Sequence, residues 1–285
     1  MKITIVNACS DLGVEVNGSE KGPIALNKFE GIVDKVITLK KENVEKELEE
    51  GNLRRNIKYV NEFNNRLYNT VLNEDNFVIT VGGDHSIAIG SDLASRKKHG
   101  SIGIIWIDAH LDYNTFETTI TGNLHGLPLA AINGLCGDLT KFTSEYINPK
   151  NTVVVGYRAM EENRDLEINN INTSGGTIFT DEDIKKYGMD YVMNKAIEIA
   201  CNGTNGIHIS YDLDSIDPEI CPGVSVPEEG GLTLNEVEVA INKIKENIDL
   251  VKSFDLVEYN PDHDIDNKTL NIGLHILKEI IDTKK

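Results

Sequence analysis

The chain has 285 residues, of which 40% are hydrophobic and 26% are charged, and its formal net charge is −18. This length allows one large α/β domain or two smaller ones, and the mixture of apolar and charged residues favours a folded protein over a disordered one. The negative charge argues against binding to nucleic acid or to anionic lipid, because both would be repelled, and it is compatible with a cationic small molecule.

The cysteines and the N-terminus favour a reducing compartment. The four cysteines are widely separated and form no C-x-x-C pair, so the sequence predicts neither a disulfide framework nor a thiolate zinc site. The apolar run after Lys2 is too short for a signal peptide, and no run of about 18 apolar residues could span a membrane. We therefore expect a cytoplasmic protein with free thiols.

Six short, β-branched apolar runs predict the strands of a parallel sheet. Their hydrophobicity is nearly continuous rather than alternating, as strands that are buried on both faces require. In chain order the runs cover residues 2–8, 77–83, 101–110, 151–157, 206–214 and 251–261.

Helical segments lie between these runs. In chain order they cover residues 43–73 (with a possible break near Gly51), 86–99, 189–202, 234–247 and 267–283. The alternation of strand and helix predicts a single α/β domain over residues 1–285, with three layers (α/β/α) and a central, mostly parallel sheet. No Pro/Gly/Ser-rich linker and no internal repeat divides the chain.

Acidic and imidazole side chains follow several of the predicted strands. The segments are GGDHS (82–86), DAHLD (108–112) and DLD (212–214), and Glu258 follows the last strand. In an extended chain, residues 108, 110 and 112 share one face. A lone D-x-H-x-D is more often a turn than a site, but parallel strands bind ligands beyond their carboxyl ends, and three such clusters at one sheet edge favour a site.

Charge compensation predicts two metal ions at this edge. The candidate ligands are His85, Asp108, His110, Asp112, Asp212 and Asp214. Their four carboxylates would repel one another and raise each other's pKa unless cations neutralise them. Two divalent cations do so and lower the pKa of a shared water, with Asp108 and Asp212 as the expected bridges. Oxygen-rich ligands with two imidazoles and no thiolate favour manganese, with iron, cobalt or nickel as substitutes.

These motifs resemble those of the ureohydrolases, the family that includes arginases and agmatinases. The matching segments are GGDHS (82–86), DAHLDYNT (108–115), TGNLHG (121–126), SYDLDSIDP (210–218), GGLT (230–233) and VEYNP (257–261). The resemblance spans nearly the whole chain. Because TGNLHG is the form typical of arginases, it implies hydrolysis of L-arginine to L-ornithine and urea. The alternatives are an agmatinase, a guanidinobutyrase or a formimidoylglutamase-type hydrolase.

The resemblance also implies a ligand assignment and an assembly. It implies two Mn²⁺ per subunit, the first held by His85, Asp108, Asp112 and Asp212 and the second by Asp108, His110, Asp212 and Asp214. It further implies a cationic guanidino substrate and a homo-oligomer, commonly a trimer or a hexamer.

Further roles follow from the same resemblance. Asn114 and Thr121 stand where arginases bind the substrate α-carboxylate, and Asn123 lies in the same loop. His125 is placed as a proton shuttle, and Glu258 is placed near the guanidinium. Asp214 is expected to relay a proton to the leaving amine. Simple turn chemistry at residues 121–123 and a surface ion pair at Glu258 remain the alternative explanations.

Two positions depart from the arginase pattern. After VVVGYR, arginases usually carry aspartates, one of which contacts the substrate α-amino group, whereas this chain reads AMEENRD and offers Glu161 as the nearest acid. Val226 stands where a threonine is common, and PGVSVP is reminiscent of formimidoylglutamases. Recognition of the amino acid is therefore less strongly predicted than hydrolysis.

Two other classes of protein compete with this interpretation. A binuclear metallophosphoesterase also uses D-x-H, but there D-x-H usually comes first in the chain, whereas here GGDH precedes DAH. A non-catalytic relative that keeps the fold would be expected to have lost metal ligands, yet all six positions are filled. Both are therefore disfavoured.

Overall fold

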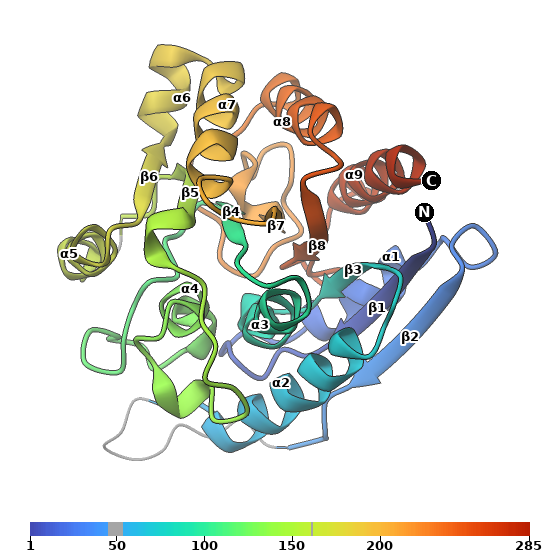
Figure 1. The fold of residues 1–285 in the computed structure, drawn as a ribbon, viewed down its shortest axis with the longest axis horizontal. Coiled ribbons are helices and arrows are strands. Elements are labelled where there is room, and N and C mark those ends of the chain that lie inside the picture. Colours follow the sequence, from blue (N-terminus) through green and yellow to red (C-terminus); the bar gives the residue numbers. More distant parts are fainter. Residues whose placement is uncertain (45–53, 161) are drawn as a thin grey trace.

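One parallel β-sheet organises the chain in the computed structural model, which describes residues 1–44, 54–160 and 162–285 (Figure 1). Eight strands pair in the order β2-β1-β3-β8-β7-β4-β5-β6, and every pair is parallel. The strands are β1 (Ile3–Cys9), β2 (Lys35–Lys40), β3 (Phe77–Gly82), β4 (Gly103–Ile107), β5 (Thr152–Tyr157), β6 (Thr177–Thr180), β7 (Ile207–Asp212) and β8 (Val251–Val257).

All six predicted strands are present, and the two that the sequence did not predict are the edge strands β2 and β6. Each of the six consists of buried residues, apart from Lys252 in β8, so a continuous apolar run reveals it. The edge strands are only partly covered, and KVITLK in β2 begins and ends with exposed lysines. Their sequences therefore lack the pattern on which the prediction depends.

Nine helices of four or more residues accompany the sheet in the described part of the chain. They are α1 (Gly22–Leu26), α2 (Ile57–Leu72), α3 (Ala88–His99), α4 (Pro128–Ile132), α5 (Arg164–Ser174), α6 (Asp181–Tyr187), α7 (Met189–Ala200), α8 (Leu234–Glu246) and α9 (Lys268–Lys284). Four predicted segments coincide with α3, α7, α8 and α9. The helices that were not predicted, α1 and α4 to α6, have at most 11 residues, too few to display a clear helical period.

The predicted helix at 43–73 is too long. Among the described residues of this segment only those of α2 are helical, and Asn56 precedes the helix with a left-handed φ of 51°. The Asn56 side chain donates to the Leu12 carbonyl over 2.9 Å, which fixes this turn against the first loop. Residues 45–53 of the predicted segment, including Gly51, lie outside the described residues.

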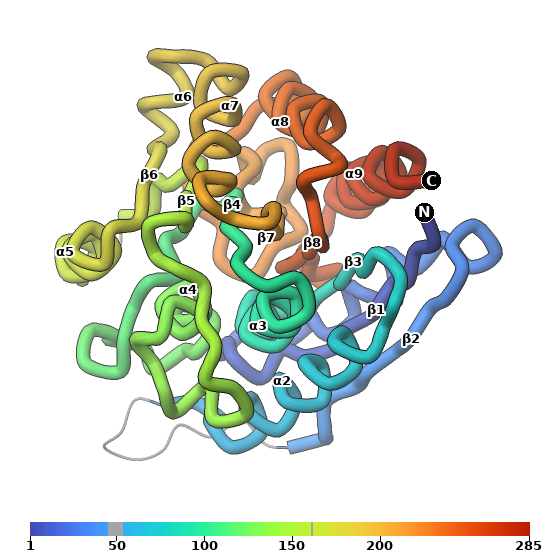
Figure 2. The backbone as a smooth tube through the Cα atoms, viewed as in Figure 1, coloured from blue at the N-terminus to red at the C-terminus, as the bar shows by residue number. Residues whose placement is uncertain are grey.

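Two hydrophobic clusters fill the two sides of the sheet and produce three layers (Figure 2). Helices α1 and α6 to α9 contribute to one cluster, and α2 to α5 contribute to the other. Alternate residues of β4 supply both, because Ile105 and Ile107 face the first cluster whereas Ile104 and Trp106 face the second. The predicted α/β/α class is confirmed.

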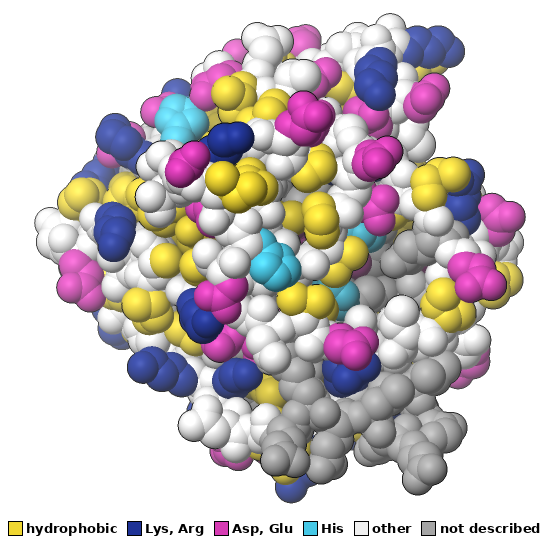
Figure 3. Space-filling model, turned by 180° about the vertical axis from the view of Figure 1, so that it is seen from behind, with side chains coloured by type: hydrophobic (Ala, Val, Ile, Leu, Met, Phe, Trp, Pro, Cys, Tyr) yellow, Lys and Arg dark blue, Asp and Glu magenta, His cyan; other side chains and the backbone are white. Residues whose placement is uncertain are grey.

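The termini, the surface charges and the helix lengths add three facts. Met1 donates from its amino group to the Lys284 carbonyl over 3.0 Å, so the two chain ends meet. On the face in Figure 3, acidic and basic side chains are interspersed rather than gathered into one basic stripe. Across the described ranges, no helix has the length and apolar character that crossing a bilayer demands.

The strand order positions the candidate site. Strands β3, β8, β7 and β4 lie side by side at the centre of the sheet, and because they are parallel their carboxyl ends share one edge. These are the strands that precede His85, Glu258, Asp214 and Asp108, respectively.

Candidate metal centre

A tight turn after β3 brings His85 to the sheet edge. Gly83 is required there, because a Cβ at this position would lie 1.9 Å from the Ser10 carbonyl oxygen. Asp84 caps the next turn by accepting from Ser86 N over 2.8 Å. His85 N then donates to Glu258 Oε1 over 2.8 Å, so the end of β8 is tied directly to the end of β3.

The D-x-H-x-D segment after β4 is a loop rather than a continued strand. The strand ends at Ile107, so the predicted strand 101–110 is too long and simple alternation does not gather these residues. Instead, Asp108 Oδ1 accepts from His110 N over 2.7 Å, and Asp112 adopts a left-handed φ of 49°. Such a conformation is uncommon for a residue with a side chain, and its cost is typical of functional sites.

The segment after β7 is fixed in a similar way. Asp212 Oδ1 accepts from Asp214 N over 2.7 Å and so caps a short 3₁₀ turn. Asp214 Oδ1 in turn accepts from Ala109 N over 3.3 Å, which joins the loops after β7 and β4.

His85 lies at the centre of a first group of carboxylates. Its Nδ1 is 3.0 Å from Asp108 Oδ2, 3.2 Å from Asp112 Oδ2 and 3.0 Å from Asp212 Oδ2. Nε2 is held by Ser210 Oγ at 2.8 Å, but Nδ1 has no hydrogen-bond partner among the described residues. A buried polar atom without a partner is costly, so this nitrogen is suited to a cation that the oxygens share.

A second group shares Asp108 with the first. His110 Nδ1 is 3.0 Å from Asp214 Oδ2 and 3.4 Å from Asp108 Oδ1. Two ligands at about 2.1 Å from one ion, at about 90–109° to each other, lie roughly 3.0–3.4 Å apart. Both groups, which together we call the paired centre, have these spacings and therefore fit two neighbouring divalent cations joined by Asp108.

The electrostatics of these side chains without a cation agree with this fit. Burial and the charge of Asp108 raise the pKa of Asp112 to about 7, and burial with Asp214 raises the pKa of Asp212 well above its usual range. Burial alone would lower the pKa of His85, but the surrounding aspartates raise it well above its usual range. Protons thus occupy the centre where cations would otherwise neutralise it.

The paired centre forms the floor of a small pocket. Its lining residues are His85, His110, Asp112, Asn114, His125, Gly126, Glu167, Asp212, Asp214, Val226 and Glu258. His125 Nδ1 lies 3.1 Å from Glu258 Oε1, and although burial lowers the pKa of His125, Glu258 raises it to about 9. Glu258 has a left-handed φ of 65°, a second strained residue in this pocket.

Two of the predicted substrate contacts, Thr121 and Asn123, do not line this pocket. Thr121 is exposed and accepts from Asn123 N over 3.2 Å, as in a turn. Asn123 Oδ1 accepts from Arg55 Nε over 2.7 Å. Glu161 lies outside the described residues. Asn114 does line the pocket, and its Oδ1 accepts from Asn163 Nδ2 over 2.6 Å.

Three further residues at the site were not predicted from the sequence. Trp106 stacks on His85 with ring centroids 3.8 Å apart, and its indole N–H donates to Asp108 Oδ2 over 2.8 Å. Glu228 Oε1 lies 3.7 Å from His110 Nε2. Glu167 in α5 is buried in the pocket wall, and its Oε1 accepts from Tyr113 N over 2.8 Å. Glu167 could have been found from the sequence by its position four residues before Ile171, because residues with this spacing share one face of a helix, here the buried face of α5.

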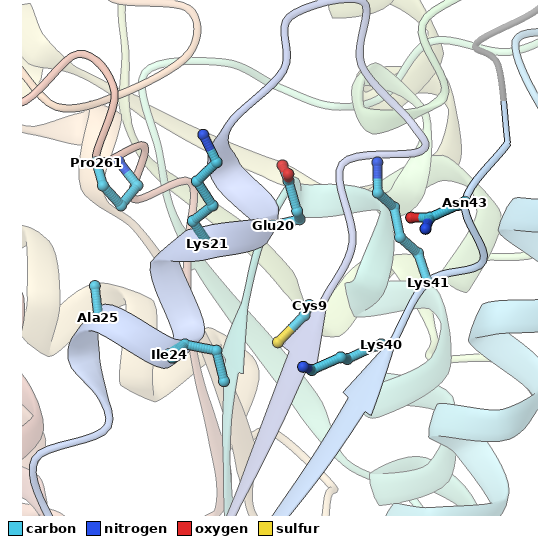
Figure 4. Close-up of a pocket in the computed structure, with 9 residues that line it drawn as sticks. All are labelled: Cys9, Glu20, Lys21, Ile24, Ala25, Lys40, Lys41, Asn43 and Pro261. Atoms are coloured by element: carbon cyan, nitrogen blue, oxygen red, sulfur yellow. The ribbon is translucent and has the colours of Figure 1, made fainter.

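A larger cavity of about 510 Å³ lies elsewhere, beside the ends of β1 and β2. Figure 4 shows Lys40 extending toward the sulfur of Cys9, with Ile24 and Ala25 of α1 on the other wall. Among the described residues that line this cavity, the single carboxylate is that of Glu20 and none is a histidine. Although this cavity is larger than the pocket at the paired centre, its described lining does not offer the group of ligands that a metal centre needs.

Comparison with known proteins agrees with the geometry. The model of the arginase family matches residues 1–282. An arginase from Bacillus caldovelox is 34% identical over 99% of this chain and 98% of its own length, and its crystal structure superposes with a TM-score of 0.90 over 98% of each chain. An Entamoeba histolytica arginase crystallised with L-ornithine is 29% identical, with a TM-score of 0.87 over 98% of each chain. The chain thus belongs to the arginase family and is a metal-dependent hydrolase.

Proposed function

We propose that residues 1–285 form a single catalytic domain that hydrolyses L-arginine to L-ornithine and urea with two Mn²⁺ per subunit. The observation that carries the proposal is the pair of imidazole–carboxylate groups that share Asp108 at the floor of a pocket. Relatives that bear the name arginase over nearly the full chain support the choice of substrate. A cytoplasmic homo-oligomer, either a trimer or a hexamer, completes the proposal.

The ligands of the metal pair would be the six predicted residues. His85, Asp112 and Asp212 surround one position, and His110 with Asp214 surrounds the other, while Asp108 faces both. When bound, the cations would supply a nucleophile at neutral pH by lowering the pKa of a water molecule, and they would neutralise the carboxylates. Their identity as manganese rests on the oxygen-rich ligand set.

Glu258 is the proposed anchor for the guanidinium group. Its Oε1 is held by the His85 N–H, whereas its buried Oε2 has no hydrogen-bond partner among the described residues. A guanidinium presents paired N–H donors that match a carboxylate. Binding there would orient the guanidinium carbon toward the paired centre and would satisfy Oε2.

The amino-acid end of the substrate is proposed to lie against the wall that contains Asn114. Thr121 and Asn123 would bind the α-carboxylate with it once they turn from their present partners. Glu167 is buried on the same wall and is the described acid best placed for the α-amino group, with Glu161 as the alternative. Val226 adds an apolar contact where a hydroxyl would offer a hydrogen bond.

Two residues would move protons. Asp214 lies between the loops after β7 and β4 and would carry a proton from the nucleophile to the leaving amine. His125 is partly exposed at the pocket and would exchange protons with solvent through its imidazole. Glu258 fixes the orientation of that ring through Nδ1.

The test is a comparison of substrates with manganese-loaded protein. Urea and ornithine are measured from L-arginine, and urea is measured from agmatine and guanidinobutyrate, each at several concentrations. We expect kcat/KM for L-arginine to exceed the other values by about 10²-fold or more, because buried groups built for an α-amino acid are left unpaired by analogues that lack it. A preference for agmatine would reassign the substrate, and the absence of urea from every substrate would overturn the proposed hydrolysis.

A further inference from the structure

A second group of imidazole and carboxylates lies inside the protein, away from the pocket. It consists of Asp92 of α3, His208 of β7 and Asp255 of β8, which we call the sheet cluster. One ligand atom from each residue lies within 4.8 Å of the others. All three side chains are fully buried, with 0% exposure.

The cluster replaces part of the hydrophobic layer between α3 and the sheet. Helix α3 turns Ser91, Asp92 and Ser95 toward the sheet, and all three are buried. On the facing strands, His208 pairs in register with Ser253, and Ser210 pairs with Asp255. A helix that buries this many polar groups against two central strands needs a compensating interaction, because buried polar groups are costly without one.

The hydrogen bonds in the cluster leave one polar atom of each residue without a hydrogen bond. His208 Nδ1 is held by Ser253 Oγ at 2.6 Å, and Ser91 Oγ donates to Asp255 Oδ2. Among the described residues, His208 Nε2, Asp92 Oδ2 and Asp255 Oδ1 have no hydrogen-bond partner. Nε2 nevertheless lies 2.8 Å from Asp92 Oδ1 and 3.6 Å from Asp255 Oδ2. Nε2 therefore forms an ion pair with these carboxylates when the ring is protonated, and it lies within reach of a cation shared with them when the ring is neutral.

This pattern repeats that of His85 at the paired centre. There, too, a hydroxyl holds one ring nitrogen while the other lies about 3 Å from aspartate oxygens without a hydrogen bond. A partner on one nitrogen fixes the tautomer that leaves the other free to bind a metal. Two carboxylates and a neutral imidazole carry a charge of −2, which one divalent cation neutralises.

We propose that the sheet cluster binds a third divalent cation of the first transition row, with His208 Nε2, one oxygen of Asp92 and one oxygen of Asp255 as ligands. Ser91 Oγ, which lies 3.3 Å from Asp92 Oδ1, is placed as the fourth ligand and third oxygen. One imidazole and three oxygens suit Zn²⁺ or Mn²⁺. The ion joins α3 to β7 and β8, and because the cluster is sealed it stabilises the fold and touches no substrate.

The competing state of the same residues is a proton in place of the ion. Burial raises the pKa of Asp92 to about 6, and the attraction of Asp92 and Asp255, acting against burial, raises the pKa of His208 to about 10. A protonated His208 between two carboxylates would also reduce the buried charge. Metal binding has to displace this proton. The two states differ in metal content, which can be counted.

The experiment counts metal in the full chain folded with Mn²⁺ alone or with Zn²⁺ alone, after removal of free ions. We expect three ions per subunit with at least one of the two metals, and two ions for Asp92→Asn, which keeps the shape of the side chain. The matched control is Asp112→Asn, which removes a carboxylate from the paired centre and is expected to leave the sheet-cluster ion in place. Because Asp92 lies outside the pocket, Asp92→Asn is expected to keep urea production within about twofold of the parent.

Two results would overturn the proposal: no more than two ions per subunit in the parent with either metal, or an unchanged count of three in Asp92→Asn. If Asp92→Asn fails to fold, the zinc-loaded parent is dialysed against EDTA, and X-ray absorption then identifies the ligands of any zinc that remains. A single ion per subunit that resists the chelator after the metal pair and urea production have been lost, and that has one imidazole ligand, supports the sheet cluster. The loss of all metal to EDTA contradicts it.

Discussion

The paired centre and the sheet cluster are built from the same parts in different surroundings. Each places an imidazole nitrogen without a hydrogen bond among aspartate oxygens, and each holds the other ring nitrogen with a serine hydroxyl. The paired centre lies beyond the carboxyl ends of the strands, where loops can open a pocket, whereas His208 lies within β7. Position along the strand, more than the choice of ligands, therefore separates a site for chemistry from a site for stability.

The second difference is what surrounds the ligands. Glu258 and His125 line the pocket at the paired centre, where we propose that they present a carboxylate oxygen and a titratable ring to the substrate. Around the sheet cluster, buried serines form hydrogen bonds with its residues, as Ser91 does with Asp255 and Ser253 does with His208. Substitutions at the paired centre are thus expected to reduce turnover, whereas substitutions at the sheet cluster are expected to reduce metal content and stability and to leave turnover nearly unchanged.

The largest effect is expected from Asp108→Asn. Asp108 is the residue that both imidazole groups share, so its loss should release the metal pair and reduce urea production by about 10³-fold or more. Metal content and kcat are measured together, with Asp92→Asn as the control that loses no turnover. Full activity in Asp108→Asn would show that the shared carboxylate is dispensable.

Glu258→Gln should have the next largest effect. The amide keeps an oxygen for the His85 N–H but removes the charge facing the guanidinium, so kcat/KM should fall by about 10²–10³-fold with both metals retained. Because the guanidinium is common to L-arginine and agmatine, kcat/KM should fall by the same factor for both substrates. A loss confined to L-arginine would place Glu258 at the amino-acid end instead.

His125→Asn should slow turnover by about 10²-fold while the metal count stays the same. The ring lies 3.1 Å from Glu258 Oε1 and outside the two imidazole–carboxylate groups, so its removal should affect proton exchange and not metal binding. Added imidazole should restore part of the rate by exchanging protons in place of the ring. Loss of metal with an unchanged rate per bound metal would contradict the assigned role.

Trp106→Phe is expected to have the smallest effect of the four. Phenylalanine keeps a ring stacked on His85 but removes the N–H that donates to Asp108 Oδ2, so the Kd for metal should rise by about tenfold. Metal titration measures this, and kcat at saturating metal should change little. The Kd of the sheet-cluster ion should not change, which distinguishes a local effect from a general loss of packing.

The sequence predicts the central strands and the metal ligands because both have local signals. A strand that is buried on both faces is a continuous apolar run, and the ligands of the paired centre follow such runs directly. The edge strands β2 and β6 lack that signal because only part of each is covered.

The sheet cluster could not be predicted in this way. Ser91 and Asp92 in α3 have the composition of an exposed helical face, and only the pairing with Asp255, 164 residues from Ser91, buries them. The D-x-H-x-D motif illustrates the same limit on a smaller scale. Its residues were predicted to converge by strand alternation, but a left-handed Asp112 and a hydrogen bond from His110 N to Asp108 bring them together.

The most direct test of the central claim is an anomalous difference map from crystals of the full chain grown with Mn²⁺. The account predicts two peaks at the pocket floor, one among His85, Asp108 and Asp212 and the other among Asp108, His110 and Asp214. A single peak, or these side chains surrounded by water alone, would contradict it.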